Sequence, residues 1–129
     1  MPKVFTSEKQ KVGELGENIA VKFLVKHDFL ILDRNYTKKW GEIDIVAEKN
    51  SKLYFIEVKS VSIEKTEGSF RPEDNMHPWK VKRLSRTIQT YLLSKKISED
   101  REWQVDLLVV FLDLKNKKAK VKVVSDIIL

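Results

Sequence analysis

The sequence predicts an α/β fold in which helices pack on the faces of a β-sheet. Two segments, residues 7–27 and 78–96, place apolar residues at the three- and four-residue spacing of an amphipathic helix. Five shorter segments are apolar or alternating runs, which are typical of strands. Their chain order is helix, three strands, helix, two strands, so we expect one sheet covered by helices. With 129 residues, the chain is expected to form one domain, residues 1–129.

Both predicted helices have recognisable starts. Ser7 can cap the first helix, because its side-chain oxygen can accept a hydrogen bond from a backbone N–H of the first turn. Pro78 fits the first turn of the second helix, where a backbone N–H has no helical acceptor. The apolar residues expected to face the sheet are Val12, Leu15, Ile19, Phe23 and Leu24 in the first helix and Val81, Leu84, Ile88, Tyr91 and Leu92 in the second.

The predicted strands cover residues 29–36, 42–47, 53–61, 104–112 and 119–124. Residues 37–41 are expected to connect the first two strands, and the polar turn 48–52 joins the next two in a hairpin. The apolar fourth strand is expected to be central, and the lysine–valine alternation of the fifth is typical of a half-exposed edge strand. Residues 63–75 are expected to form an exposed loop, which is a candidate substrate lid.

Composition excludes several classes of protein. No run approaches the roughly eighteen apolar residues of a membrane span, and residues 1–6 lack a signal-peptide apolar segment, so we expect a cytoplasmic protein with no membrane partner. The absence of cysteine excludes disulfides and thiolate zinc sites. Any metal must therefore be held by oxygen or imidazole, which favours magnesium, manganese or calcium.

Positive charge is concentrated on the second predicted helix. The chain carries a net charge of +6, and no acidic residue occurs between residues 75 and 98. This pattern favours a polyanionic partner such as nucleic acid, with a solvated helix face as the alternative. The basic residues that we expect to contact nucleic acid are Lys80, Lys82, Arg83 and Arg86.

Three charged residues lie inside otherwise apolar strands. Asp44 interrupts the second predicted strand, and Glu57 and Lys59 interrupt the third. Charged side chains are depleted in strands and costly to bury unpaired, so these residues need a compensating partner. Glu57 and Lys59 are two residues apart and share a strand face, as do Glu42 and Asp44. If the hairpin brings these faces together, Asp44, Glu57 and Lys59 converge on one point.

A divalent metal is one partner that suits this cluster. Magnesium is commonly held by one or two carboxylates with water and substrate phosphate, so Asp44 and Glu57 are a sufficient anchor, and the Val58 carbonyl could add a ligand. Lys59 would stabilise the negative charge that grows on a phosphate during phosphodiester hydrolysis. The alternative is a cross-strand salt bridge on an exposed sheet face. Spacing alone leaves both interpretations open.

Five separated blocks resemble the YraN family in order and spacing, from about residue 13 to residue 110. The blocks are GELGENIA (13–20), ILDRNY (31–36), GEID (41–44), FIEVK (55–59) and PWKVKRL (78–84). That family looks like a branch of the restriction-endonuclease-like PD-(D/E)xK superfamily and is similar to the archaeal Holliday junction resolvases. The resemblance implies a restriction-endonuclease-like mixed β-sheet flanked by helices, in the order α-β-β-β-α-β-β.

The resemblance also implies a catalytic tetrad of Glu17, Asp44, Glu57 and Lys59, with Mg²⁺ or Mn²⁺ as the cofactor. Spacing alone favours a solvated helix position for Glu17, whereas the resemblance makes it a metal-site residue that binds directly or through water. The implied metal ligands are then Asp44, Glu57, the Val58 carbonyl and Glu17.

Other family positions have different interpretations. Asp106 also matches a family block, but nothing in the chemistry requires it near a metal, so a structural role is expected. His77, which is not part of these blocks, could be a ligand or a base, and the alternative is a solvated histidine before Pro78. The family often has a Lys-Thr-Arg run where this chain has Lys59 followed by Ser60 and Val61, which weakens phosphate contact there. Asp28 replaces a usual glycine, and aspartate tolerates the left-handed backbone.

Three functions compete. The leading hypothesis is a metal-dependent endonuclease that acts on DNA, branched or otherwise structured, in repair or recombination. The alternative is a nucleic-acid-binding module that keeps the nuclease fold without catalysis. A third hypothesis is a protein-interaction domain anchored by Trp40 and Trp79, although Trp79 could instead staple the start of its helix. The resolvase resemblance adds a homodimer, because a two-fold enzyme suits a two-fold junction.

Overall fold

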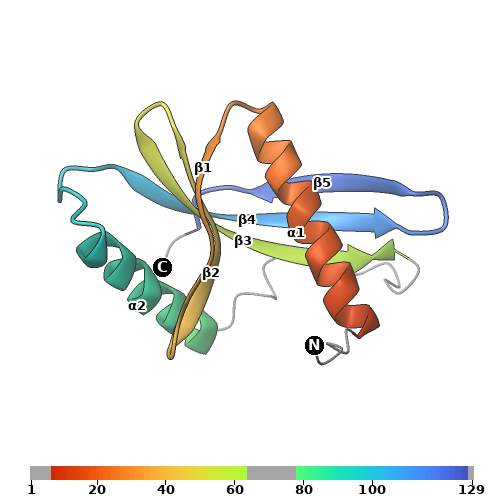
Figure 1. Ribbon diagram of the computed structural model, residues 1–129, viewed down its shortest axis with the longest axis horizontal. Helices are drawn as coiled ribbons and strands as arrows, with labels where there is room; N and C mark the ends of the chain where they lie inside the picture. The colour runs from red at the N-terminus through yellow and green to blue at the C-terminus, as the bar shows by residue number, and fades with distance from the viewer. Residues whose placement is uncertain (1–6, 64–77, 128–129) are drawn as a thin grey trace, which may run out of the picture.

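The computed structural model describes residues 7–63 and 78–127 and has the predicted α/β architecture (Figure 1). Two helices flank one mixed sheet of five strands, in the predicted order α-β-β-β-α-β-β. The elements are α1 (Glu8–Lys26), β1 (Leu30–Lys38), β2 (Gly41–Lys49), β3 (Lys52–Ser62), α2 (Pro78–Ser94), β4 (Trp103–Asp113) and β5 (Lys118–Val124).

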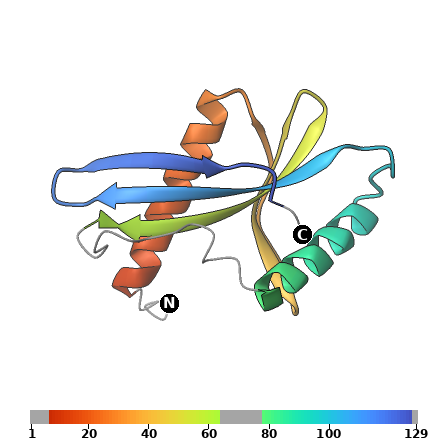
Figure 2. The same cartoon turned by 180° about the vertical axis from the view of Figure 1, so that it is seen from behind.

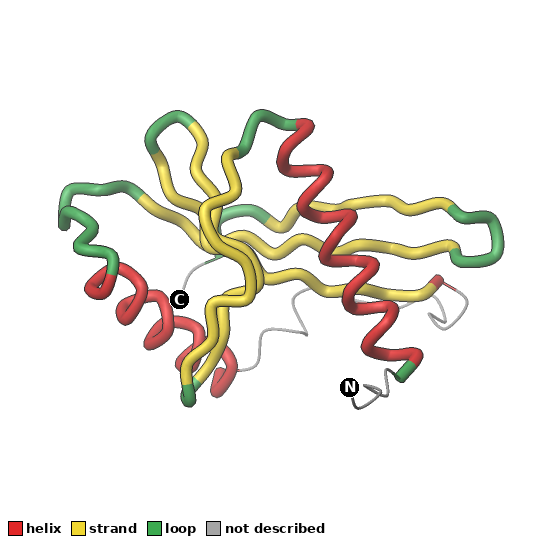
Figure 3. Tube along the Cα trace, viewed as in Figure 1, coloured by secondary structure: helices red, strands yellow, loops and turns green. Residues whose placement is uncertain are grey.

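The sheet has one crossover. Its strand order is β1-β2-β3-β4-β5, and neighbouring strands are antiparallel except for β3 and β4. A parallel pair needs a connection that returns to the starting edge of the sheet, and α2 lies in that connection (Figure 3). As predicted, β4 is buried over most of its length between β3 and the edge strand β5.

The two helices cover opposite faces of the sheet. Ile56 of β3 packs in a cluster with Ala20 and Leu24 of α1, whereas its neighbour Phe55 packs with Ile88 of α2. Adjacent strand residues point to opposite faces, so the two clusters lie on either side of the sheet. Figure 2, seen from behind, shows β4 and β5 in front of α1, with α2 beside the other end of the strands.

The predicted start of α1 is confirmed in detail. The Ser7 hydroxyl accepts from the Gln10 N–H at 3.1 Å, while the Gln10 side chain accepts from the Ser7 N–H at 3.0 Å. This reciprocal capping box satisfies two N–H groups that the helix itself leaves unpaired. After the helix, Asp28 has φ 69°, so the aspartate adopts the left-handed backbone expected at this position.

Both hairpin turns are tighter than the sequence predicted. β1 runs on to Lys38 and β2 begins at Gly41, so only residues 39–40 connect them instead of 37–41. At the next turn, Asn50 and Ser51 have φ 51° and 65°, which lets a two-residue loop join β2 to β3. The strands therefore reach further than hydrophobic patterning indicates, because backbone pairing continues through polar residues.

Two other predicted segments need comment. The second helix ends at Ser94 rather than near residue 96, where Lys96 adopts φ 53° and cannot continue a right-handed helix. The predicted loop 63–75, the candidate lid, lies outside the described residues except for Ile63. Neither α1 nor α2 is long and apolar enough to cross a membrane, in the part of the chain that the structure describes.

The sheet forks between β2 and β3. Their pairing runs from Lys49–Lys52 to Ile45–Ile56 and stops there, although β1 and β2 stay paired down to Lys38–Gly41. In Figure 1 the lower end of the β1–β2 hairpin turns toward α2, while β3 continues under α1. Beyond Ile56, β3 therefore has no strand paired with it on its β2 side.

A kink in the β1–β2 hairpin accompanies the fork. Ile45 packs in the α1 cluster, but Ile43, two residues away, packs in the α2 cluster, so the alternation of faces breaks at Asp44. Opposite Asp44 in the register lies Asn35, whose φ of 53° is left-handed. Asparagine tolerates this conformation better than most residues. The kink places Asp44 at the point where the strands separate.

We predict that Gly16 sets the distance between α1 and β3. A Cβ at Gly16 would lie 1.7 Å from Ser60 Oγ and 2.7 Å from Ser60 Cβ, which rotation of the serine cannot relieve. Gly16→Ala should therefore lower the free energy of unfolding by about 1–3 kcal/mol through overpacking. Chemical denaturation measures this loss.

Gly13→Ala is the matched control, because a Cβ there meets nothing within 4 Å. It should raise stability by roughly 0.5–1 kcal/mol through helix propensity. Equal effects of the two substitutions would contradict the packing argument.

Candidate active site

The fork holds the charged residues that the sequence singled out. Val58 of β3 lies just beyond the last β2–β3 pair, and its N–H donates to Asp44 Oδ2 at 2.8 Å. The aspartate carboxylate therefore replaces the strand acceptor that β2 no longer supplies. Asp44 is tied to β3 by this bond and lines the cavity at the fork.

Glu57, next to Val58, is the most deeply buried acid of the site. Only 7% of the residue is exposed, and its Oε2 lies 3.9 Å from Lys80 Nζ of α2. Its Oε1 is buried without a hydrogen-bond partner among residues 7–63 and 78–127. A buried carboxylate oxygen with no partner is costly, so this atom can accept a cation or a hydrogen-bond donor from outside the described residues.

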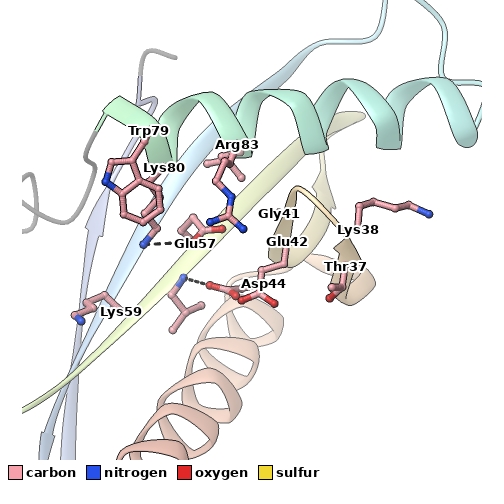
Figure 4. A pocket seen from close by; sticks show the side chains of 12 residues that line it. Thr37, Lys38, Gly41, Glu42, Asp44, Glu57, Lys59, Trp79, Lys80 and Arg83 are labelled. Carbon is pink, nitrogen blue, oxygen red and sulfur yellow. Dashed lines mark hydrogen bonds and ion pairs between the residues drawn. The ribbon is translucent and has the colours of Figure 1, made fainter.

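A cavity of about 490 Å³ opens at the fork between β2, β3 and the start of α2 (Figure 4). As predicted, Asp44, Glu57 and Lys59 come together there. The full lining is Thr37, Lys38, Gly41, Glu42, Asp44, Glu57, Val58, Lys59, Trp79, Lys80, Arg83 and Leu84. Carboxylates and cations thus share one cavity wall.

Burial dominates the electrostatics of the two acids. It raises the pKa of Asp44 to about 6, against the lowering effect of the Val58 hydrogen bond, and nearby Glu42 and Glu17 raise it further. Burial and the Asp44 charge raise the pKa of Glu57 to about 8, although Lys80 acts in the opposite direction. Near neutral pH the pair therefore resists carrying two negative charges unless a cation joins it.

The lysine closest to the acids is Lys80. Figure 4 shows its ammonium reaching Glu57, while the Lys59 side chain extends away from the Asp44 carboxylate. Lys80, which the sequence predicts to contact nucleic acid from the head of the second helix, also enters the carboxylate site. The sequence pattern missed this contact, because α2 is joined to β3 by a long connection and no local spacing relates the two residues.

Glu17 of α1 lies on the other side of Asp44. It lines a second cavity of about 280 Å³ together with Asp44, Val58 and Lys59. Its carboxylate accepts from Arg34 Nη2 at 3.2 Å. The structure thus brings Glu17 to the site that the family resemblance implied, and it identifies Arg34 as a partner that sequence analysis did not consider.

The remaining basic residues of α2 differ in their surroundings. Lys82 is exposed. Arg83 donates from Nε to the Trp40 carbonyl at 2.8 Å, and its guanidinium lies 5.8 Å from the Trp79 ring centroid. The Arg86 guanidinium lies 4.3 Å from the Trp40 ring centroid. Arg83 and Arg86 therefore also hold the β1–β2 turn against α2.

Asp106 has the structural contacts expected of it. Its Oδ1 accepts from Gln104 Nε2 at 2.7 Å and from the Asp126 N–H at 2.9 Å. Next to it, the Ile127 N–H donates to the Val105 carbonyl at 2.7 Å. These bonds fasten the segment after β5 to β4. The prediction for His77 lies outside the described residues.

The site residues fit a metal of the magnesium type. No three histidine, cysteine, aspartate or glutamate side chains are grouped to hold a metal ion within residues 7–63 and 78–127. Magnesium, however, commonly uses only one or two carboxylates and takes its other ligands from water and phosphate. Asp44 and Glu57 supply two carboxylates, and the unpartnered Oε1 of Glu57 supplies an oxygen in need of a cation.

Comparison with known proteins identifies relatives across most of the chain. The family described as Uncharacterised protein family UPF0102 matches residues 16–119, which include the fork, α2 and the C-terminal part of α1 from Gly16 onward. The chain belongs to the UPF0102 family. This confirms the family resemblance seen in the sequence blocks and leaves the relationship to the nuclease superfamily as a prediction.

Individual UPF0102 proteins align over nearly their full length. A UPF0102 protein of Campylobacter lari is 41% identical over 101 residues, which cover 78% of this chain and 84% of the relative. One from Alkaliphilus oremlandii is 37% identical over 113 residues, covering 87% and 92% respectively. The matches therefore cover about four fifths or more of this chain.

The raised pKa of Glu57 predicts a pH-dependent stability in the absence of metal. The group binds its proton more tightly in the folded state, so its stabilising effect is full below about 4.5 and is lost as pH rises through about 8. In EDTA, the free energy of unfolding should fall over this range by an amount on the order of 2–4 kcal/mol, since a pKa change of one corresponds to about 1.4 kcal/mol.

Glu57→Gln should remove most of this fall and be the more stable protein at the upper end of the range. Glu99→Gln, which neutralises an exposed carboxylate outside the cavity, is the control and should keep the wild-type slope. Parallel stability curves for wild type and Glu57→Gln would disprove the assignment.

Proposed function

We propose that this UPF0102 protein is a metal-dependent endonuclease that cuts DNA, branched or otherwise structured, in repair or recombination. One observation carries the proposal: the half-buried carboxylate of Asp44 and the buried carboxylate of Glu57 line one cavity at the fork of the sheet, and one Glu57 oxygen is left unpartnered among the described residues. A structural salt bridge would pair that oxygen. In a site that binds a divalent cation and a phosphate, that oxygen stays available as a ligand for the cation.

Three groups of the chain would hold the metal. Asp44 and Glu57 supply carboxylate oxygens, and the Val58 carbonyl faces the same side of β3 as its N–H, which bonds Asp44. Mg²⁺ or Mn²⁺ bound there would activate a water molecule and stabilise charge on the phosphate. The Val58 N–H fixes the Asp44 carboxylate, so the ligand is held in place before substrate arrives.

The two lysines would share the task of charge stabilisation. Lys59 lines both cavities, so its flexible side chain can reach a phosphate in either. Lys80 holds the Glu57 carboxylate at 3.9 Å and offsets part of its charge. With a metal bound to that carboxylate, the Lys80 ammonium would be available to a non-bridging phosphate oxygen.

Glu17 would act from the α1 side of Asp44. Its ion pair with Arg34 fixes its direction, and its charge is close enough to raise the pKa of Asp44. We propose that it reaches the metal through water, which agrees with the PD-(D/E)xK resemblance. The homodimer also remains a prediction of the resolvase resemblance, and light scattering at several concentrations tests it.

A second candidate is a nucleic-acid-binding module without catalysis. The observation that favours it is the basic, acid-free surface of α2, where Lys82 is exposed beside Arg83 and Arg86. Such a module needs the cations and does not need the carboxylates. Neutralising Asp44 or Glu57 therefore distinguishes the two candidates, because it should greatly slow cleavage by an endonuclease but leave DNA binding by a non-catalytic module unchanged.

The endonuclease proposal predicts that Asp44→Asn and Glu57→Gln each slow metal-dependent cleavage by about 100-fold or more, because metal-assisted charge stabilisation is worth several kcal/mol. Asparagine keeps an oxygen acceptor for the Val58 N–H, so the fork should stay intact. The measurement follows labelled duplex, single-stranded and four-way-junction DNA with Mg²⁺ or Mn²⁺.

Glu99→Gln serves as the control and should cut at the wild-type rate, because it lies outside both cavities. Two results count against the endonuclease: no metal-dependent cutting of any substrate by the wild type, and equal cutting by Asp44→Asn.

Both candidates predict that Lys82→Ala weakens DNA binding. The slope of the logarithm of the binding constant against the logarithm of the salt concentration should decrease in magnitude by about 1, as expected for loss of one phosphate contact. Lys22→Ala is the control, because it removes the same charge from the exposed surface of α1 and lines neither cavity. Fluorescence anisotropy across a salt series measures both variants. Equal slopes for the wild type and Lys82→Ala would remove α2 from the binding surface.

A further inference from the structure

We propose that Trp79 is a stacking platform for one unpaired nucleobase beside the cavity at the fork. This inference rests on the proposed function and names its substrate class: nucleic acid with an unpaired nucleotide next to the phosphate at the carboxylate site. Trp79 lies at the head of α2 and lines the same cavity as Asp44 and Glu57 (Figure 4).

The exposure of Trp79 is the first observation. The residue is 59% exposed, although tryptophan is among the side chains with most to gain from burial. If it served only as a staple at the helix start, it would be packed against the core. Its indole instead forms part of the cavity wall, so it offers apolar surface to whatever enters the cavity.

Trp40, another tryptophan near α2, is less exposed than Trp79. Trp40 is half-buried, its indole lies under Arg86 at 4.3 Å, and its carbonyl accepts from Arg83. Trp40 therefore packs the β1–β2 turn onto α2. Trp79 also has a guanidinium near its ring, that of Arg83 at 5.8 Å, and the residue is 59% exposed.

The charges around Trp79 favour a nucleotide over a peptide. Lys38, Lys59, Lys80 and Arg83 line the cavity with it, together with the carboxylates of the proposed metal site, and α2 itself carries no acidic residue. Cations suit the phosphates of a nucleotide, and an indole suits the face of its base. The cavity of about 490 Å³ is within the size range of small-ligand pockets, which matches one nucleotide rather than a helix or strand of a partner protein.

Stacking on Trp79 requires a base whose face is free. Inside a duplex both faces of each base are covered by its neighbours, so only an unpaired base can lie on the indole. Stacking is tolerant of base identity because every base has a π-face. The proposal therefore selects forks, flaps and junctions with unpaired nucleotides, without a sequence preference.

The test measures binding without cleavage, by fluorescence anisotropy in EDTA. The probes are a short oligothymidylate, an oligomer of equal length in which every base is replaced by an abasic site, and a duplex. Trp79→Ala should weaken binding of the oligothymidylate by roughly 5- to 150-fold, the effect of losing one stacked base. It should leave the abasic probe and the duplex within about twofold of wild type. Trp79→Phe should keep most of the affinity.

Leu93→Ala is the control, because Leu93 is an exposed apolar residue of the same helix that lies outside the cavity. It should bind all probes like the wild type. Melting temperatures confirm that the exposed substitutions leave the fold intact.

Equal loss of affinity for all three probes, or none for any, overturns the stacking proposal. If the stacking proposal fails but the wild type cuts DNA with metal and Asp44→Asn does not, the endonuclease proposal still stands. If the wild type binds no probe and cuts nothing, both proposals fall.

Discussion

The backbone N–H of Val58 has lost its strand partner, and the carboxylate of Asp44 takes the place of that partner. Everything else at the site depends on this substitution. The fork exists because β2 leaves β3 after Ile45–Ile56, and a buried backbone donor left there unpaired would be costly. An aspartate is the side chain that both closes this gap and leaves an anionic oxygen in the opening. Asp44 therefore has a structural role, as acceptor for the Val58 N–H, and a proposed chemical role, as a metal ligand.

The fork also explains why a second acid is tolerated next to the first. Glu57 is buried against α2, where Lys80 offsets part of its charge and Asp44 opposes it. This balance costs stability near neutral pH, because burial of both carboxylates opposes their ionisation. Gly16 contributes from the opposite face, because its close approach to Ser60 lets α1 carry Glu17 to the same point. Two helices on opposite faces therefore reach one opening in the sheet.

Local patterns in the sequence were enough to predict most of the fold and the centre of the site. Apolar spacing located both helices and all five strands, and the placement of Asp44, Glu57 and Lys59 inside apolar strands indicated their convergence. The kink at Asn35 and the early end of β2–β3 pairing were not predictable, because strict alternation assumes a regular strand. Nor were the Lys80–Glu57 and Arg34–Glu17 pairs, since both depend on how the helices pack across the sheet. Turn lengths were overestimated because polar residues still pair through their backbone.

The central claim is that the opening at the fork is a divalent-metal site built on Asp44 and Glu57. Anomalous diffraction from a crystal of the protein soaked in Mn²⁺ tests it most directly. The account predicts an anomalous peak at the fork, within coordination distance of the Asp44 and Glu57 carboxylates. A fully soaked crystal with no peak at the fork, or with manganese bound only elsewhere, would contradict it.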